Sequence, residues 1–218
     1  MKVKVVADIL GANDRIAAEN NRLFKECGVF VINVMSSPGA GKTTLLEKTL
    51  EALKDKYRIG VIEGDVATTA DADRIEKMGV PVVQINTGSA CHLDGNMVRN
   101  ALDEFDLMSL DLLIVENVGN LVCPAEFNVG EDCKVMLLSV PEGDDKPLKY
   151  PLMWHESKAL VINKIDLIPY TNFDIDKATR DSLSLNPKLD IFPVSCRTGE
   201  GLEDWYGWLT GNLKRSDA

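Results

Sequence analysis

Short apolar runs and longer polar segments alternate along most of the chain. Each apolar run has the length of a strand, and most of the polar segments between them are long enough for a helix. Apolar strands that alternate with helices are typical of a parallel sheet with helices on both faces. We therefore predict a three-layer α/β fold whose mainly parallel sheet is flanked by helices. The predicted strands are 29–35, 59–62, 80–85, 112–115, 134–140, 160–162 and 191–194, and the predicted helices are 43–54, 70–78, 96–105 and 174–185.

The segment ahead of the first predicted strand has a helical pattern. Its apolar residues fall near one face of a helix over residues 4–27. They are Val5, Ile9, Ile16, Leu23 and Phe24. We expect this N-terminal segment, residues 1–27, to pack on the sheet. The stretch 141–150 has the composition of a loop, not of a domain boundary, so we expect one domain over residues 1–218.

Charge and cysteine content narrow the functional class. With 24 basic and 34 acidic residues among 218, the chain carries a net charge of −10. Non-specific binding to nucleic acid needs a basic surface that displaces counterions, so we expect no nucleic-acid partner. No apolar run approaches the roughly 20 residues of a membrane span, and the N-terminus lacks a signal-peptide pattern. Five scattered cysteines, an odd number, favour a reducing cytoplasm over a disulfide framework.

The first predicted strand leads into SSPGAGKTT, residues 36–44, and then into a predicted helix. This stretch fits the phosphate-loop pattern G-x-x-x-x-G-K-S/T, with Ser36 in place of the first glycine. In such a loop, backbone N–H groups surround the phosphates, Lys42 contacts the β- and γ-phosphates, and the Thr43 hydroxyl binds Mg²⁺. The alternative is an ordinary glycine turn, which the strand–loop–helix context disfavours. We predict a P-loop NTPase domain with nucleotide contacts at Gly39, Ala40, Gly41, Lys42, Thr43 and Thr44.

A second motif, N-K-I-D at residues 163–166, indicates which base is bound. The Asp166 carboxylate can accept N–H bonds from both N1 and the N2 amino group of guanine, a donor pair that adenine lacks. The apolar stem of Lys164 can cover the ring. The loop S-C-R after the last predicted strand resembles the S-A-K loop of GTPases. These motifs favour GTP and GDP and disfavour a small-molecule kinase. The predicted contacts to the base are Asn163, Lys164, Asp166, Ser195, Cys196 and Arg197.

Three acidic residues are candidates for the Mg²⁺ side of the site. Glu116 ends an apolar run, where a Walker B acid binds Mg²⁺ directly or through water, although a capping role is the alternative. Asp65 ends another strand, and Asp71 starts a helix, where acids also serve as ordinary N-terminal charges. We predict Lys42, Asp65, Asp71 and Glu116 as catalytic residues, and Thr43 and Glu116 as Mg²⁺ ligands.

A second group of candidate ligands contains sulfur and nitrogen. Cys91 and His92 are adjacent after the third predicted strand, where we expect them to open a helix. Cys123 follows Glu116 by seven residues. Two thiolates and an imidazole would suit Zn²⁺ or Ni²⁺. Three ligands leave a tetrahedral site incomplete, however, and buried packing cysteines with a hydrogen-bonded histidine remain an open alternative.

In combination, these stretches resemble the nickel-insertion GTPases of NiFe-hydrogenase maturation, the HypB family. The resemblance covers nearly the whole chain from about residue 20. It rests on SSPGAGKT, GDVATTADADRI, TGSACHLDG, VENVGNLVCPAEF, PEGDDKPLKYP and NKID. It implies a slow GTPase of the signal-recognition/MinD-like class that forms a homodimer with GTP bound. It also implies a nickel-delivery partner protein and a hydrogenase large-subunit precursor. The family's metal ligands fall on Cys91, His92 and Cys123, at a dimer interface where a second subunit would complete the site.

The chain departs from the family in two places. Many members carry an N-terminal cysteine-rich motif or a histidine-rich tract, whereas the first cysteine here is Cys27, so we expect no tight N-terminal nickel site. Ser37 stands where many MinD-like relatives have a lysine that reaches across the dimer. Because Glu116 and Cys123 share one short segment, we predict that nucleotide state alters metal geometry. A regulatory GTPase with structural cysteines, or a urease-type nickel GTPase, is the alternative function.

Overall fold

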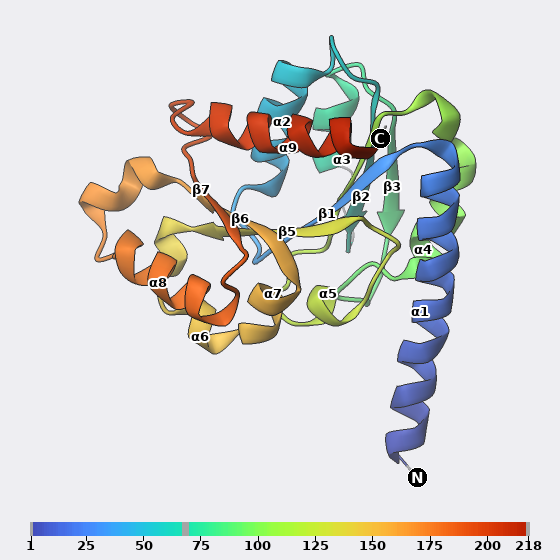
Figure 1. Ribbon diagram of the computed structural model, residues 1–218, viewed down its shortest axis with the longest axis horizontal. Helices are drawn as coiled ribbons and strands as arrows, with labels where there is room; N and C mark the ends of the chain where they lie inside the picture. The colour runs from blue at the N-terminus through green and yellow to red at the C-terminus, as the bar shows by residue number, and fades with distance from the viewer. Residues whose placement is uncertain (1, 67–69, 217–218) are drawn as a thin grey trace.

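The computed structural model describes residues 2–66 and 70–216, with the side chains of residues 10–66 and 71–213. Its centre is a seven-stranded sheet in the order β3-β2-β4-β1-β5-β6-β7. Every neighbouring pair of strands runs parallel, which confirms the predicted α/β fold (Figure 1). The strands are β1 Phe30–Ser36, β2 Ile59–Asp65, β3 Val82–Asn86, β4 Leu112–Glu116, β5 Cys133–Ser139, β6 Ser157–Asn163 and β7 Asp190–Pro193.

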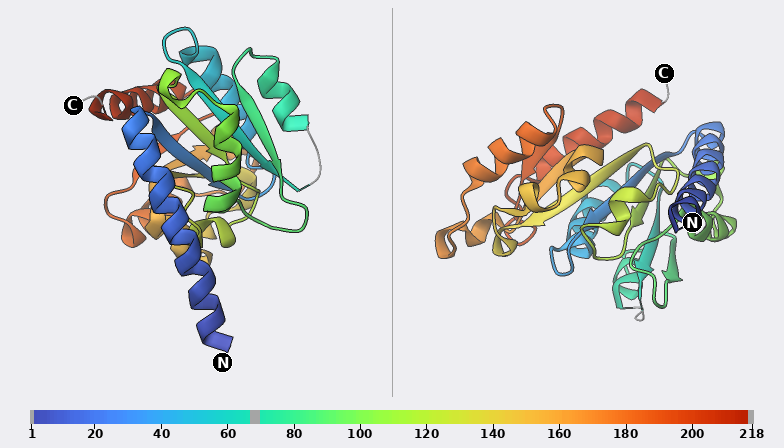
Figure 2. Two further views of the ribbon diagram at one scale, coloured as in Figure 1. Left: turned by 90° about the vertical axis from the view of Figure 1, so that its right-hand side faces the viewer. Right: turned by 90° about the horizontal axis from the view of Figure 1, so that it is seen from below.

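Helices cover both faces of the sheet (Figure 2). The buried side chains of α2, α3 and α9 belong to one apolar cluster, and those of α1 and α4 and of α7 and α8 belong to two clusters on the opposite face. The α-helices are α1 Lys2–Cys27, α2 Lys42–Leu53, α3 Ala70–Glu76, α4 Gly95–Ala101, α5 Cys123–Glu126, α6 Lys146–Lys149, α7 Pro151–Glu156, α8 Ile175–Leu185 and α9 Leu202–Ser216. Short 3-10 helices are η1 Leu102–Glu104, η2 Leu107–Ser109, η3 Val140–Glu142 and η4 Ile165–Tyr170.

The central strand β1 shows why the apolar runs of this chain are continuous. Ile32 and Val34 pack into the cluster under α2 and α9, whereas Val31 and Met35 point to the opposite face. All four side chains are almost fully buried. A strand covered on both faces has no solvent-facing side chains, so it shows no alternation of polar and apolar residues.

All seven strands were predicted, but several helices were not. The stretch 141–150, predicted as a loop, contains η3 and α6, and none of the predicted elements covers α5, α7 or α9. For α9 a helical signal was present, because the buried residues Leu202, Trp205 and Leu209 recur at intervals of three and four. The glycines and the polar loop residues ahead of it masked that periodicity.

Both apolar contacts and the buried side chain of Asn20 hold the second half of α1 against the rest of the domain. The fully buried Asn20 donates through Nδ2 to the carbonyl oxygens of Gly95 and Val129, at 2.8 and 3.0 Å. Phe24, also predicted to face the domain, is fully buried, whereas the predicted contacts of Val5 and Ile9 lie outside the described side chains. Among the described residues, no helix is both long and apolar enough to span a membrane.

We expect Asn20→Ala to lower the free energy of unfolding by about 2–3 kcal/mol, because two buried carbonyl groups would lose their donor. Urea unfolding followed by circular dichroism measures this change. Arg22→Ala, on the exposed side of the same helix, is the control and should change stability by less than about 0.5 kcal/mol. Equal changes in unfolding free energy for the two variants would show that the hydrogen bonds of Asn20 do not contribute to stability.

Candidate functional site

The phosphate loop connects the end of β1 to α2, at the carboxyl edge of the sheet. Gly41, just before α2, has φ 103°, and a Cβ there would lie 2.6 Å from Nδ2 of Asn163. This position therefore requires glycine for two independent reasons. Lys42, Thr43 and Thr44, the first residues of α2, line a cavity of about 550 Å³. Unpaired N–H groups at a helix N-terminus favour phosphate.

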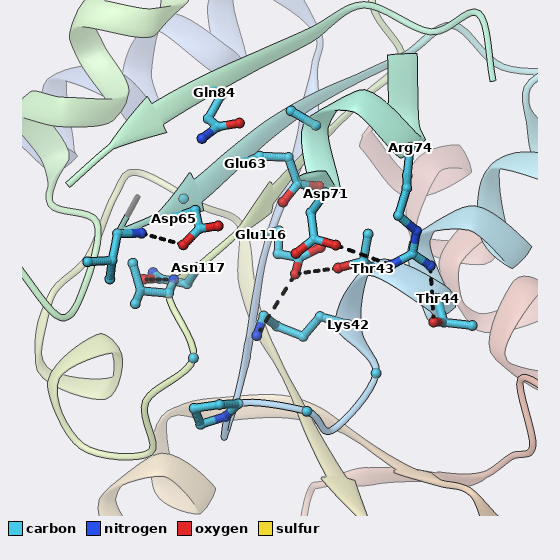
Figure 3. Close-up of a pocket in the computed structure, with 18 of the residues that line it drawn as sticks. Lys42, Thr43, Thr44, Glu63, Asp65, Asp71, Arg74, Gln84, Glu116 and Asn117 are labelled. Carbon is cyan, nitrogen blue, oxygen red and sulfur yellow. Dashed lines mark hydrogen bonds and ion pairs between the residues drawn. The ribbon is translucent and has the colours of Figure 1, made fainter. Parts of the chain in front are cut away.

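A buried cluster of three side chains lines this cavity, and its members are Lys42, Thr43 and Glu116 (Figure 3). The Thr43 hydroxyl donates to Oε1 of Glu116 at 3.1 Å, and Nζ of Lys42 lies 3.9 Å from the same oxygen. Lys42 also donates to the Ser36 hydroxyl at 3.1 Å. A hydroxyl and a carboxylate beside the phosphate loop are oxygen ligands of the kind that Mg²⁺ prefers.

The same cavity is also lined by two aspartates, Asp65 and Asp71. Asp65 is the last residue of β2, and Asp71 lies in the first turn of α3, as predicted. Arg74 fixes Asp71 through an Nη1–Oδ1 contact of 3.1 Å and is itself paired with Glu47. Residues 67–69, between the two acids, lie outside the described residues.

Glu63 is a site residue that the sequence analysis missed. It lies on β2 opposite Glu116 of β4, is 3% exposed, and lines the cavity. Among the described residues, Oε1 of Glu63 and Oε2 of Glu116 have no hydrogen-bond partner. The predicted strand 59–62 ended three residues before the end of β2 and so left out Glu63. A carboxylate that interrupts the apolar stretch IGVIEGD was the available signal.

Burial raises the pKa of both carboxyl groups of this pair. For Glu63, desolvation is the largest cause, and the charges of Glu116 and Asp71 act in the same direction. For Glu116, desolvation is again the largest cause, and the positive charge of Lys42 opposes it. Among the described residues, only one lysine lies near these two buried carboxyl groups. A bound cation would therefore stabilise their charged forms.

The N-K-I-D segment connects the base-binding loops to the phosphate loop. Asn163, at the end of β6, donates through Nδ2 to the Ala40 carbonyl at 3.0 Å. Its Oδ1 accepts from the N–H groups of Lys164 and Cys196, at 2.7 and 3.3 Å. Nζ of Lys164 donates to the Gly39 carbonyl at 2.7 Å. These bonds hold three distant segments of the chain in one arrangement.

The carboxylate predicted to bind guanine is oriented by the loop after β7. The Ser195 hydroxyl donates to Oδ1 of Asp166 at 2.6 Å and accepts from the N–H of Thr198 at 3.1 Å. Arg197 is exposed, and Cys196 is buried. Burial raises the pKa of the Cys196 thiol to about 11, so this cysteine stays protonated at neutral pH.

The tertiary fold brings the side chains of Cys91, His92 and Cys123 together within one chain. Their sulfur and nitrogen atoms all lie within 4.8 Å of one another, and the two Sγ atoms are 3.0 Å apart. The prediction that Cys91 and His92 open a helix is wrong. Helix α4 begins only at Gly95, because Asp94 caps it by accepting from the N–H of Met97 at 2.7 Å. Cys123 is the first residue of α5.

The protonation states of this cluster affect how it can bind a metal. His92 stacks on Phe127 with ring centroids 3.9 Å apart, and burial lowers the pKa of the imidazole, which favours the neutral form that binds metals. The hydrogen bond with Cys91 and then burial raise the pKa of the Cys123 thiol. A metal would therefore have to displace protons from sulfur in order to bind.

The remaining cysteines and the second histidine lie apart from this cluster. Cys133 is buried in β5, and desolvation raises the pKa of its thiol to about 12. Cys27 is partly buried against the cluster under α1, and His155 is exposed. Among the described residues, Cys91, His92 and Cys123 are the only group of three or more cysteine, histidine or acidic side chains whose ligand atoms all lie within 4.8 Å of one another.

The fold and this site define a nucleotide-binding P-loop domain of the CobW/HypB/UreG class, whose family profile matches residues 30–193. The hydrogenase maturation factor HypB of Azotobacter vinelandii is 50% identical over 207 residues, which cover 95% of this chain and 68% of that protein. The chain therefore belongs to the HypB family of hydrogenase maturation factors.

HypB from Helicobacter pylori extends the comparison in both sequence and structure. The hydrogenase/urease maturation factor HypB of this organism is 46% identical over 95% of this chain and 86% of its own length. A crystal structure of HypB from Helicobacter pylori in complex with nickel superposes with a TM-score of 0.88 and 44% identity. That match covers 94% of this chain and 96% of the other.

We expect Glu63→Gln to stabilise the nucleotide-free and Mg²⁺-free protein at neutral pH. The folded-state pKa of Glu63 lies above its unfolded value, so the wild type loses stability as pH rises past the ordinary carboxyl range. The amide has no such cost. The difference in unfolding free energy should therefore grow from near zero at about pH 5 to about 1–3 kcal/mol at about pH 8.

Urea unfolding across that pH range measures the difference, with Glu104→Gln on the exposed surface of η1 as the control. A constant difference at all pH values would contradict a raised pKa for Glu63.

Proposed function

We propose that this chain is a GTP-hydrolysing metallochaperone that delivers nickel during hydrogenase maturation and couples nucleotide state to metal binding. One observation carries the proposal. The segment that begins at Glu116, in the nucleotide cavity, ends at Cys123, where the three soft ligand atoms meet within 4.8 Å. A movement of this segment between nucleotide states would therefore change the geometry of the metal ligands.

GTP would occupy the cavity with its phosphates on the loop from Gly39 to Thr44 and on the N-terminus of α2. Lys42 would contact the β- and γ-phosphates. Asp166, oriented by Ser195, would accept the two N–H groups that distinguish guanine from adenine, and the stem of Lys164 would cover the ring.

Mg²⁺ fits the oxygen donors beside the phosphate loop, where Thr43 and Glu116 would hold it with Asp65 and Asp71 nearby. The bound ion would neutralise charge on the transferring phosphoryl group. Lys42 would remain beside Glu116, and the two aspartates would orient water at the open side of the cavity. Arg74, which lines the cavity, is paired with Glu47 and Asp71. If it does not act as an arginine finger, turnover should be slow, on the order of 10⁻⁴ s⁻¹.

Nickel would be the cargo of Cys91, His92 and Cys123, and Zn²⁺ would fit the same donors. Three donors leave at least one coordination position open. A homodimer with a second set of ligands, a nickel-delivery partner, or the hydrogenase large-subunit precursor could fill it. Because one relative is a hydrogenase/urease maturation factor, a urease-type role for the same site is the second candidate.

We expect Asp166→Asn to weaken GTP binding by at least about 100-fold and to favour xanthosine triphosphate, because the amide can donate to the xanthine O2. Competition between labelled GTP and each nucleotide measures the preference. Asp176→Asn makes the same chemical change at an exposed position on α8 and should leave GTP affinity unaltered. Unchanged GTP affinity in Asp166→Asn would remove this residue from the base site.

We expect Ni²⁺ to bind with different affinities in the GDP form and in a form with a non-hydrolysable GTP analogue. Linkage requires Ni²⁺ to change nucleotide affinity by the same factor. Cys123→Ala should weaken Ni²⁺ binding by about 10–100-fold or more, and the affinity of the wild type should rise with pH as the thiols lose protons. Calorimetric titrations measure these affinities.

Cys27→Ala, outside the cluster, is the matched control and should bind Ni²⁺ like the wild type. Equal Ni²⁺ affinities in the two nucleotide forms of the wild type would refute the coupling. Unchanged Ni²⁺ affinity in Cys123→Ala would show that Cys123 is a structural residue and not a metal ligand.

A further inference from the structure

Leu93, the residue after His92, packs against the end of β2 in the nucleotide cavity. Its side chain is fully buried, and a Cβ on Gly64 would lie 2.8 Å from both Cγ and Cδ1 of Leu93. Gly64 itself lines the cavity, between Glu63 and Asp65. Leu93 thus packs directly on the backbone of β2. Any residue larger than glycine at position 64 would displace the leucine side chain.

The backbone of Leu93 is joined to the end of β4 by a hydrogen bond. Its N–H donates at 2.9 Å to Oδ1 of Asn117, the residue that follows Glu116. Asn117 is fully buried and lines the cavity. Asp65, at the end of β2, lines the same cavity (Figure 3). The residue next to His92 therefore contacts two residues that line the nucleotide cavity, Gly64 through its side chain and Asn117 through its backbone.

Asn117 is held by further bonds, so its side chain has little freedom to reorient. Its Oδ1 also accepts from the N–H of Val118 at 3.0 Å, and its Nδ2 donates to Oδ1 of Asn33 at 3.1 Å. Its own N–H donates to the Val34 carbonyl at 2.9 Å. A shift at the end of β4 must either carry Leu93 with it or leave a buried N–H unpaired, which is costly.

We propose that Leu93 and Asn117 are positioning residues that connect the nucleotide cavity to the Cys91–His92 half of the metal site. This inference rests on the proposed function, in which Cys123 is connected to the same cavity through residues 118–122. The ligand set is then attached to the cavity by two separate routes. A change at the ends of β2 and β4 alters the separation between the Cys91–His92 pair and Cys123, because close-packed groups transmit small displacements.

The test compares Leu93→Ala with Leu102→Ala, a matched truncation of a buried leucine in the same apolar cluster. Neither residue is a metal ligand or a predicted nucleotide contact. Calorimetry gives the Ni²⁺ dissociation constant in the GDP form and in the GTP-analogue form, and their ratio is the coupling factor. For the wild type we expect a factor of about 5–150. In Leu93→Ala the factor should fall toward one, whereas Leu102→Ala should keep the wild-type value.

Two further variants keep the test decisive if Leu93→Ala does not fold. Asn117→Ser shortens the acceptor that reaches the Leu93 N–H, and it should also lower the factor. Leu93→Met nearly conserves the side-chain volume, so it should keep the coupling factor close to the wild-type value. The absorption spectrum of bound Ni²⁺ should change between nucleotide states in the wild type and much less in Leu93→Ala, because the spectrum reports ligand geometry.

The possible outcomes separate the two proposals. A wild-type factor of one refutes the proposed coupling itself. A wild-type factor above one that survives in both Leu93→Ala and Asn117→Ser overturns only the role of Leu93 and Asn117. Loss of the factor in Leu102→Ala as well would show that general softening of the cluster, not this connection, controls the metal site.

Discussion

The parallel pairing of β4 between β1 and β2 is the constraint on which both candidate sites depend. It aligns Val34 with Glu116 and Glu63 with Glu116, so the phosphate loop and two carboxyl groups emerge at one edge of the sheet. Loops that leave the carboxyl ends of parallel strands meet in a shared crevice. The same pairing sends residues 117–123 out of the nucleotide cavity toward the cysteine and histidine cluster. Neither site could shift independently of the sheet.

The charges that line the nucleotide cavity favour the binding of a cation. Glu63 and Glu116 are buried side by side, their pKa values are raised, and each has an oxygen without a hydrogen-bond partner among the described residues. Lys42 offsets part of this charge. Unfavourable contacts of this kind are typical of functional sites, where a ligand completes the interactions that the protein leaves unfinished.

The group formed by Cys91, His92 and Cys123 depends on different interactions. Burial lowers the pKa of the His92 imidazole, which stacks on Phe127, and the hydrogen bond with Cys91, together with burial, raises the pKa of the Cys123 thiol. A divalent cation must therefore compete with protons, which makes binding depend on pH. HypB from Helicobacter pylori, which is 44% identical to this chain, has been crystallised in complex with nickel.

Local sequence determined the seven strands, the phosphate loop and the N-K-I-D motif, because each depends on residues within a few positions of one another. Glu63 was missed because its importance comes from Glu116, which is distant in sequence and lies on the neighbouring strand. The convergence of Cys91 and His92 with Cys123 was likewise decided by the tertiary structure, since no local spacing fixes a distance across 32 residues. The contact of Leu93 with Gly64 and Asn117 has the same origin: only the packed sheet decides which loops meet.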